Sequence, residues 1–231
     1  MKRFLVLSCS VAISALFFHA CSFSDDSMID APLTRADAVS EKIVFQDDFN
    51  QADSIPDRNK WSLCKKGSPA WSKYLSESYD QAYVHDGKLV LVAEKVNGVY
   101  KTGGVQSLGK AEFQYGKIEI CARFTKTAKG GWPAIWMMPA KPVYSGWPAC
   151  GEIDIMEQLN HDGIVYQTIH SHYKNDLGFT KPVPTKTVSY NKGQFNIFGI
   201  EWTPEALTFK VNGATTLVYP NLHLADESVK K

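Results

Sequence analysis

Short segments that alternate between hydrophobic and polar residues recur along the chain from about residue 43 onward. In "YGKIEICARF", one side carries Ile118, Ile120, Ala122 and Phe124. A period of two is typical of β-strands with one buried face. The pairs Asp86-Gly87 and Asn212-Gly213 separate such segments and are favoured in two-residue hairpin turns. No long helical pattern follows residue 20, so the sequence predicts an all-β sandwich, whose sheets bury one face and can curve the other into an open groove.

The first 40 residues follow a different pattern. Lys2 and Arg3 precede an apolar run that ends at Ala20, which is typical of a secretory signal over residues 1–20. Cys21 follows a small residue at the end of this run, as in a bacterial lipobox, and would then carry a lipid; a plainly cleaved signal is the alternative. Residues 21–40 are polar and small and predict a lipid-anchored tether before a folded domain at 41–231. We therefore expect an outer-membrane lipoprotein of a Gram-negative cell envelope, facing the surface or the periplasm, that contacts the membrane only through its lipid.

The composition limits the kinds of partner and cofactor that the sequence suggests. The 25 Lys and Arg nearly balance the 24 Asp and Glu, so the charge gives no reason to expect nucleic acid as a partner. Aromatic residues make up 12% of the chain, which suits either a core or sugar recognition. Cys64, Cys121 and Cys150 remain in the expected mature chain, either as one pair and a free thiol or as three thiols. No cysteine or histidine spacing indicates zinc, and we expect a monomer without a cofactor.

The segment "ACGEIDIMEQ" at residues 149–158 presents a conflict of parity. On a regular strand Glu152 and Asp154 share one face, while Glu157 points into the core beside Ile153 and Ile155. An unpaired carboxylate in the core costs several kcal/mol. A β-bulge at residues 155–156 removes the conflict, because one extra residue returns Glu157 to the face of the other acids.

Such a bulged strand predicts a reaction. Glu152 and Glu157 would lie roughly 13 Å apart between Cα atoms, and side chains that lean together bring the carboxyl groups to about 5–6 Å. Retaining glycosidases need about 5–5.5 Å, which favours a double displacement by these two residues. Asp154 lies between them, can position the nucleophile and disfavours ionisation of its neighbour. An exposed acidic strand or a calcium site is the alternative reading of the same residues.

The motif "GEIDIMEQ" resembles the signature of glycoside hydrolase family 16 in its bulged E-x-D-x-x-E form. The upstream "YGKIEI", "GGWPAIWMMP" and "WPACGEIDIME", with "FQDDFN" and "FGIEWTPEALTFKVNG", resemble the laminarinase-like members over residues 43–219. The resemblance implies a jelly-roll sandwich with a concave substrate cleft and retaining endo-hydrolysis of a β-linked polysaccharide. It makes Glu152 the nucleophile, Asp154 its supporting residue and Glu157 the acid/base. Because family members continue beyond the equivalent of "LADESVKK", the chain resembles a C-terminally truncated member that lacks its last strands.

Substrate-binding candidates surround these acids. Trp132 and Trp136 share a strand face, and Trp147 precedes the acid strand, so each could stack on a sugar or pack in the core. Glu119 and Arg123 alternate with the apolar side of their strand and are expected to point toward the groove. The resemblance places His170 near the acid/base, whereas His172 is better explained as structural. Asp47 and Asp48 resemble a region where some members bind structural calcium.

Two function classes follow from these observations. The first is an endo-acting glycoside hydrolase on β-1,3-glucan or mixed-linkage β-1,3/1,4-glucan, with an endo-β-galactosidase on mucin-type or algal galactan chains as the runner-up. The family's acid strand serves both substrate types, and Cys121, where members often have Arg, leaves room for the second. The other class is a glycan-binding lipoprotein without catalysis, which the intact acids argue against.

Overall fold

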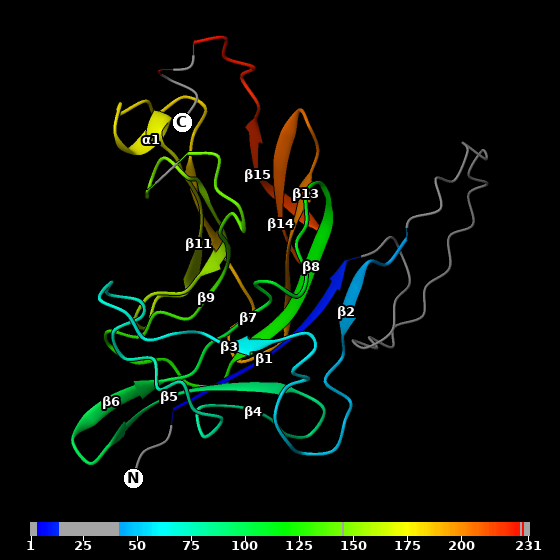
Figure 1. The fold of residues 1–231 in the computed structure, drawn as a ribbon, viewed down its shortest axis with the longest axis vertical. Helices are drawn as coiled ribbons and strands as arrows, with labels where there is room; N and C mark the ends of the chain where they lie inside the picture. The colour runs from blue at the N-terminus through cyan, green and yellow to red at the C-terminus, as the bar shows by residue number, and fades with distance from the viewer. Residues whose placement is uncertain (1–3, 14–41, 145, 227, 229–231) are drawn as a thin grey trace.

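The computed structural model describes residues 4–13, 42–144, 146–226 and 228 (Figure 1). Cys21 and all of the expected tether lie outside the described residues. The larger sheet contains, in spatial order, β15 (Ala214–Pro220), β14 (Ala206–Val211), β13 (Asn196–Trp202), β8 (Gly116–Phe124), β1 (Phe4–Ile13), β5 (Leu89–Val96) and β4 (Ala82–Val84). β2 (Phe45–Asp47) pairs with β1, and β6 (Val99–Thr102) pairs with β5.

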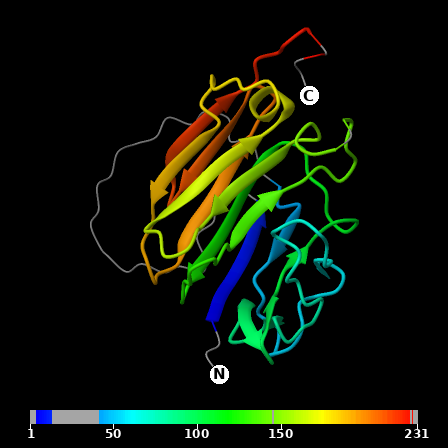
Figure 2. The same ribbon diagram turned by 90° about the vertical axis from the view of Figure 1, so that its left-hand side faces the viewer.

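The smaller sheet has four antiparallel strands and faces the viewer in Figure 2. Its order is β12 (Thr185–Ser189), β11 (Ile164–His170), β10 (Glu152–Glu157) and β9 (Ala134–Met137). β3 (Ser62–Leu63) and β7 (Val105–Gln106) form a separate pair, and α1 (His172–Asn175) is a single helical turn after β11. Among the described residues, no helix is long and apolar enough to span a membrane.

The main core lies between the two sheets. It joins Ile118, Ile120 and Phe124 of β8 and Phe198 of β13 with buried residues of β10 and β11. Alternate residues of β8 are buried along its length, as the period of two predicts. The predicted all-β sandwich is confirmed.

Both predicted hairpin turns are also confirmed. Asp86 and Gly87 between β4 and β5 have φ of 50° and 65°, and Asn212 and Gly213 between β14 and β15 have φ of 49° and 81°. Positive φ at both turn positions matches the right-handed twist of the strands, and Asn, Asp and Gly adopt it most readily. These short turns fix the register of the strand pairs on either side of them.

The expected orientation of Glu119 and Arg123 toward the groove is wrong. β8 belongs to the larger sheet, and its apolar side faces the shared core, so its polar side points away from the acid strand. Glu119 forms an ion pair with Lys117 at 3.0 Å, and the Arg123 guanidinium lies 4.7 Å from the ring centre of Phe195. Cys121 shares this outer face, so its departure from the family pattern says nothing about a sugar subsite.

Residues 4–13 lie inside the region expected to be a signal, yet in this structure they form β1 between β5 and β8 (Figure 1). Val6 stands opposite both Leu91 and Phe124 in the register of the sheet. Cleavage after residue 20 is a processing event that this structure does not test, and it stays a prediction.

The turn that ends β10 is held by one buried amide. The side-chain nitrogen of Gln158 donates to the carbonyl oxygens of Leu159, Asn160 and Asp162 at 3.0, 3.3 and 3.1 Å. Gln158 is fully buried and directly follows Glu157, so it fixes the end of the acid strand.

Replacing Gln158 with Glu should destabilise the protein by about 3 kcal/mol at neutral pH, because a buried carboxylate would face three carbonyl oxygens without a proton to donate. Burial would raise the pKa of this new carboxyl, so the lost stability should return as the pH falls and the group becomes protonated. Urea unfolding at neutral pH and at successively lower pH values measures the change in the free energy of unfolding. The matched control is Q194E, at an exposed site where a change of less than about 0.5 kcal/mol is expected. Equal stability of the two variants at neutral pH would contradict the role of Gln158.

Candidate active site

The acid strand β10 is bulged where the parity argument requires it. Its pairing with β11 shifts between Asp154 and Glu157, and its pairing with β9 shifts between Asp154 and Met156. Ile155 and Met156 are consecutive, yet each is only 1% exposed and each packs in the core. Two adjacent residues therefore point inward, and the predicted β-bulge is confirmed.

The bulge returns Glu157 to the face that carries Glu152 and Asp154. Directly opposed residues of an antiparallel pair share a face. Glu152 stands opposite His170, Asp154 opposite Thr168 and Trp136, and Glu157 opposite Tyr166 and Ala134. The outer face of the smaller sheet, turned toward the viewer in Figure 2, thus carries all three carboxyl groups.

Trp132 contacts the last of the three acids. Its indole N–H donates to Glu157 Oε1 at 2.6 Å, and its side chain is 52% exposed. The loop that carries it is tied to the turn after β10, because Gly130 N–H donates to Asn160 Oδ1 at 2.8 Å and Asn160 N–H donates to Gly131 O at 2.9 Å. The indole therefore holds a fixed place beside the carboxyl group.

Trp147 makes the corresponding contact with the first acid. Its indole N–H donates to Glu152 Oε2 at 2.5 Å, its side chain is 57% exposed, and its ring centre lies 5.5 Å from that of His170. The loop closes tightly behind it, since Cys150 N–H donates to Gly146 O at 2.8 Å. Each outer glutamate thus receives one indole N–H, and each indole keeps surface free for a ligand.

Asp154 is the most enclosed of the three, at 2% exposure. His170 Nε2 lies 3.2 Å from Asp154 Oδ2, but this buried oxygen has no well-aligned hydrogen-bond donor among the described residues. Burial raises the pKa of Asp154, the nearby His170 opposes that rise, and the charge of Glu152 adds to it. The Asp154 carboxylate in turn raises the pKa of His170. Proton uptake at Asp154 is therefore coupled to its neighbours.

Glu157 is held toward its protonated form. Burial raises its pKa first, and the charge of Asp154 raises it further. The indole N–H of Trp132 lowers it, because it stabilises the carboxylate. The net effect is a raised pKa of Glu157, which suits a group that must donate a proton near neutral pH.

The tautomer of His170 is set by a residue that the sequence did not reveal. Asn175 Oδ1 accepts the backbone N–H of Ser171 at 3.2 Å, which turns Asn175 Nδ2 toward His170 Nδ1 at 3.1 Å. An amide nitrogen can only donate, so Nδ1 must accept, and the proton of neutral His170 sits on Nε2 beside Asp154. Ser171 also caps α1 by accepting Lys174 N–H at 3.3 Å, which holds Asn175 in place.

Trp136 lies on the acid face with a second tryptophan against it. Ile135 and Met137 pack into the core, so Trp136 points outward, opposite Asp154. Trp71 contacts it edge to face, with ring centres 5.1 Å apart, and is itself half exposed. Trp71 was not predicted, because nothing in its local sequence indicates that it reaches β9.

The structure therefore brings seven of the predicted site residues together and separates two. The seven that meet at the acid face are Glu152, Asp154, Glu157, Trp132, Trp136, Trp147 and His170. Glu119 and Arg123 lie on the far sheet. His172 pairs with Asp176 at 2.6 Å, in keeping with the structural role expected of it.

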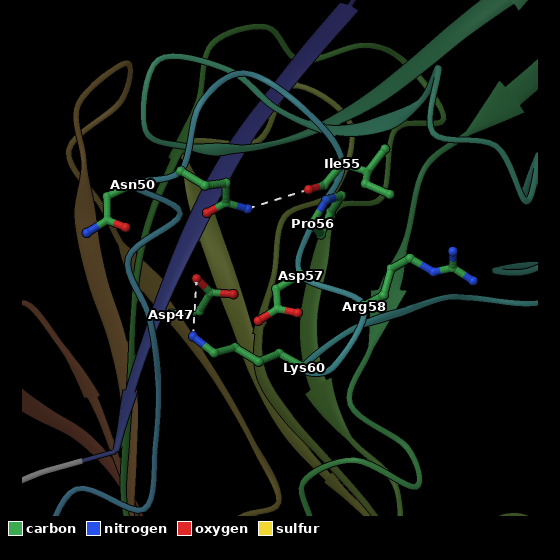
Figure 3. A pocket seen from close by; sticks show the side chains of 8 residues that line it. Asp47, Asn50, Ile55, Pro56, Asp57, Arg58 and Lys60 are labelled. Atoms are coloured by element: carbon green, nitrogen blue, oxygen red, sulfur yellow. Dashed lines mark hydrogen bonds and ion pairs between the residues drawn. The ribbon is translucent and has the colours of Figure 1, made fainter.

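Asp47 and Asp48 are the residues at which the family resemblance suggested a structural calcium ion. Asp47 is buried, accepts the Trp61 indole N–H at 2.7 Å and the Phe49 N–H at 3.1 Å, and lies 3.7 Å from Lys60 Nζ. Figure 3 shows this ion pair in a surface pocket of about 490 Å³. Asp47 thus holds three protein donors, and Asp48 accepts from the Gln46 amide at 2.7 Å.

Two of the three cysteines expected in the mature chain, Cys64 and Cys150, are free thiols in the part of the chain that the structure describes. Burial raises the pKa of Cys64 to about 11, so its thiolate is not populated at neutral pH.

A β-sandwich whose outer face carries two half-buried glutamates, an intervening buried aspartate and exposed tryptophans has the site of a carbohydrate-active protein. The chain belongs to glycosyl hydrolases family 16, whose family model matches residues 71–227.

Relatives within the family differ in their substrates. The chain is 36% identical to the keratan-sulfate endo-1,4-beta-galactosidase of Sphingobacterium multivorum over 77% of its own length and 43% of that protein. It is 31% identical to the beta-glucanase of Rhodothermus marinus over 80% of its length and 68% of that protein. It also matches a solved structure from work on endo-acting O-glycanases with which human gut bacteria initiate mucin breakdown, at 35% identity and a TM-score of 0.71, covering 82% of this chain and 80% of that one. The chain thus spans less than half of the keratan-sulfate enzyme.

Replacing Trp132 with Phe should raise the pKa of Glu157 further. The substitution keeps an aromatic ring beside the carboxyl group but removes the N–H that stabilises the carboxylate. A ¹³C NMR titration of the Glu157 carboxyl group measures the shift. W71F is the control: it makes the same change at Trp71, which contacts Trp136, and it should leave the pKa of Glu157 unchanged. A pKa that stays constant or falls in W132F would contradict the assigned contact.

Replacing Asn175 with Asp should raise the pKa of His170. A carboxylate at this position would favour a proton on Nδ1 while Asp154 continues to favour one on Nε2, so the doubly protonated ring gains stability. ¹⁵N NMR of the histidine ring reports both the tautomer and the pKa. N59D adds the same charge at an exposed site and should leave His170 unchanged. Wild-type His170 protonated on Nδ1 rather than Nε2 would refute the arrangement.

Proposed function

We propose that the protein is a retaining, endo-acting glycoside hydrolase of β-linked polysaccharides. The observation that carries the proposal is the bulged strand, which presents Glu152 and Glu157 on one face with Asp154 between them. The raised pKa of Glu157 supports the assignment of the two roles, because the acid/base must start protonated.

The reaction follows from these roles. The Glu152 carboxylate attacks the anomeric carbon, the glycosidic C–O bond breaks, and the leaving oxygen takes the proton of Glu157. In the second step Glu157 takes a proton from water, whose oxygen attacks the same carbon and releases Glu152. Asp154 positions Glu152, and its negative charge raises the pKa of Glu157. Two inversions at one carbon give net retention.

For the substrate, we favour a galactose-containing chain of the keratan sulfate or mucin type. The comparisons support this choice, since identity to the keratan-sulfate enzyme is 36% and to the beta-glucanase 31%. This reverses the order of the sequence-based expectation. The argument from Cys121, which had left room for a galactan, does not hold, so the choice rests on the comparisons alone. A β-1,3- or mixed-linkage glucan remains the second candidate, favoured by the laminarinase-like motif.

A secreted location is part of the proposal. Such polymers are too large to enter a cell, and the apolar run before Cys21 supports export and lipid anchoring at a Gram-negative outer membrane. Mass spectrometry of the purified membrane form would show diacylglycerol on Cys21 if the lipobox is used, and an unmodified new N-terminus if it is not.

The test of function is incubation with keratan sulfate, mucin glycans, laminarin and lichenan. Oligosaccharides from one polymer, with the β-anomer formed first by NMR, support the proposal. Inverted products, release of single sugars only, or binding without cleavage would overturn it; the last outcome is the lectin-like alternative.

Variants of the two glutamates should then behave differently. E157Q should lower kcat by about 10²–10⁴-fold on the polymer and much less on an aryl glycoside, whose leaving group needs no proton. E152Q should abolish turnover of both, because no covalent intermediate forms. E201Q, on the larger sheet, is the matched control. The assignment fails if E152Q retains activity on the aryl glycoside while E157Q loses it.

A further inference from the structure

A second surface adjoins the acid face at its β9 edge. The segment 69–76 runs from Trp71, which contacts Trp136 of β9, to β6. Thr102 N–H donates to Tyr74 O at 2.8 Å, and Ser76 N–H donates to Thr102 O at 3.0 Å. Leu75 is buried beneath the segment. In Figure 2 this part of the chain, in cyan and green, borders the sheet that carries the acids.

This surface displays two tyrosines, each with a lysine over its ring. Tyr74 and Tyr100 are 42% and 57% exposed and meet edge to face at 5.7 Å. Lys73 Nζ lies 4.9 Å from the ring centre of Tyr74, and Lys95 Nζ lies 5.3 Å from that of Tyr100. We call these four residues the lysine–tyrosine patch.

The positive charge of the patch is not neutralised by neighbouring acids. Within the described residues neither Lys73 nor Lys95 forms an ion pair. Glu77 is engaged by Lys65 Nζ at 3.0 Å and by the backbone N–H of Lys66 at 2.8 Å. Glu94 is buried and accepts the Gln81 amide at 2.9 Å. Two exposed ammonium groups thus remain available to an anion.

We propose that the lysine–tyrosine patch is an outer subsite that binds a sulfated sugar of the polysaccharide substrate. The inference rests on the proposed function, because it assigns the patch to the same bound chain. Tyrosine rings suit the apolar face of a pyranose, and the two ammonium groups suit a sulfate ester. A neutral glycan would use only the rings. Since Trp71 and Trp136 link the patch to Asp154, one extended chain can occupy the acids and the patch together.

The test compares keratan sulfate with the same chains after chemical desulfation. The wild type should cleave the sulfated chain with a kcat/KM about tenfold higher, and this advantage should shrink as salt rises from about 0.05 to 0.5 M. K73Q/K95Q should lose the advantage and keep the wild-type kcat/KM on desulfated chains. The control K117Q/K186Q removes the same charge from surfaces outside the acid face and should retain the higher kcat/KM on sulfated chains.

Two results would overturn the inference. One is wild-type protein that cleaves desulfated chains as well as sulfated ones. The other is K73Q/K95Q losing activity equally on both. If the wild type cleaves neither chain, keratan sulfate is not its substrate, and the proposed function is decided separately by mucin glycans, laminarin and lichenan. Calorimetric binding of sulfated and desulfated oligosaccharides then tests the patch: sulfate-dependent binding that K73Q/K95Q abolishes supports the inference, and equal binding refutes it.

Discussion

The bulge in β10 is the constraint on which the rest of the site depends. Burying Ile155 and Met156 together contributes roughly 1.5–3 kcal/mol for each side chain. Regular alternation would instead bury Glu157 and expose Met156, which loses one of these contributions and adds the cost of a desolvated carboxylate. The core therefore selects the irregular strand, and the pairing with β9 and β11 on both sides holds it. Stability and chemistry favour the same local geometry.

Around this strand, few donors serve three acids. Trp132 and Trp147 each give one N–H to an outer glutamate, whereas the buried Oδ2 of Asp154 lies 3.2 Å from His170 Nε2 and has no well-aligned donor among the described residues. Additional donors would lower the pKa of Glu157 and remove the proton that its proposed role requires. Asn175 fixes the ring proton of His170 and adds no charge to the site. The sparse hydrogen bonding is thus a condition for keeping one of three close carboxyl groups protonated.

The sequence was informative wherever the answer depended on neighbours in one strand or hairpin. The parity of "EIDIME" predicted the bulge, and Asp86-Gly87 and Asn212-Gly213 predicted their turns. Glu119 and Arg123 were misplaced because alternation identifies the two faces of a strand but not the sheet that the strand joins. Trp71 and Asn175 were missed for a related reason: their partners, Trp136 and His170, are met through a long loop and a single helical turn that no local pattern specifies.

The N-terminal segment shows how one composition can serve two structures. An apolar run such as residues 4–13 satisfies both a secretion signal and the interior of a sheet. As β1 it supplies ladder partners to β5 and β8, which are otherwise separated. Cleavage of the signal would leave the facing backbone N–H and C=O groups of those strands without partners, at a cost for each group comparable to a lost hydrogen bond. If the segment is cleaved, another strand must therefore enter this position or the larger sheet must rearrange.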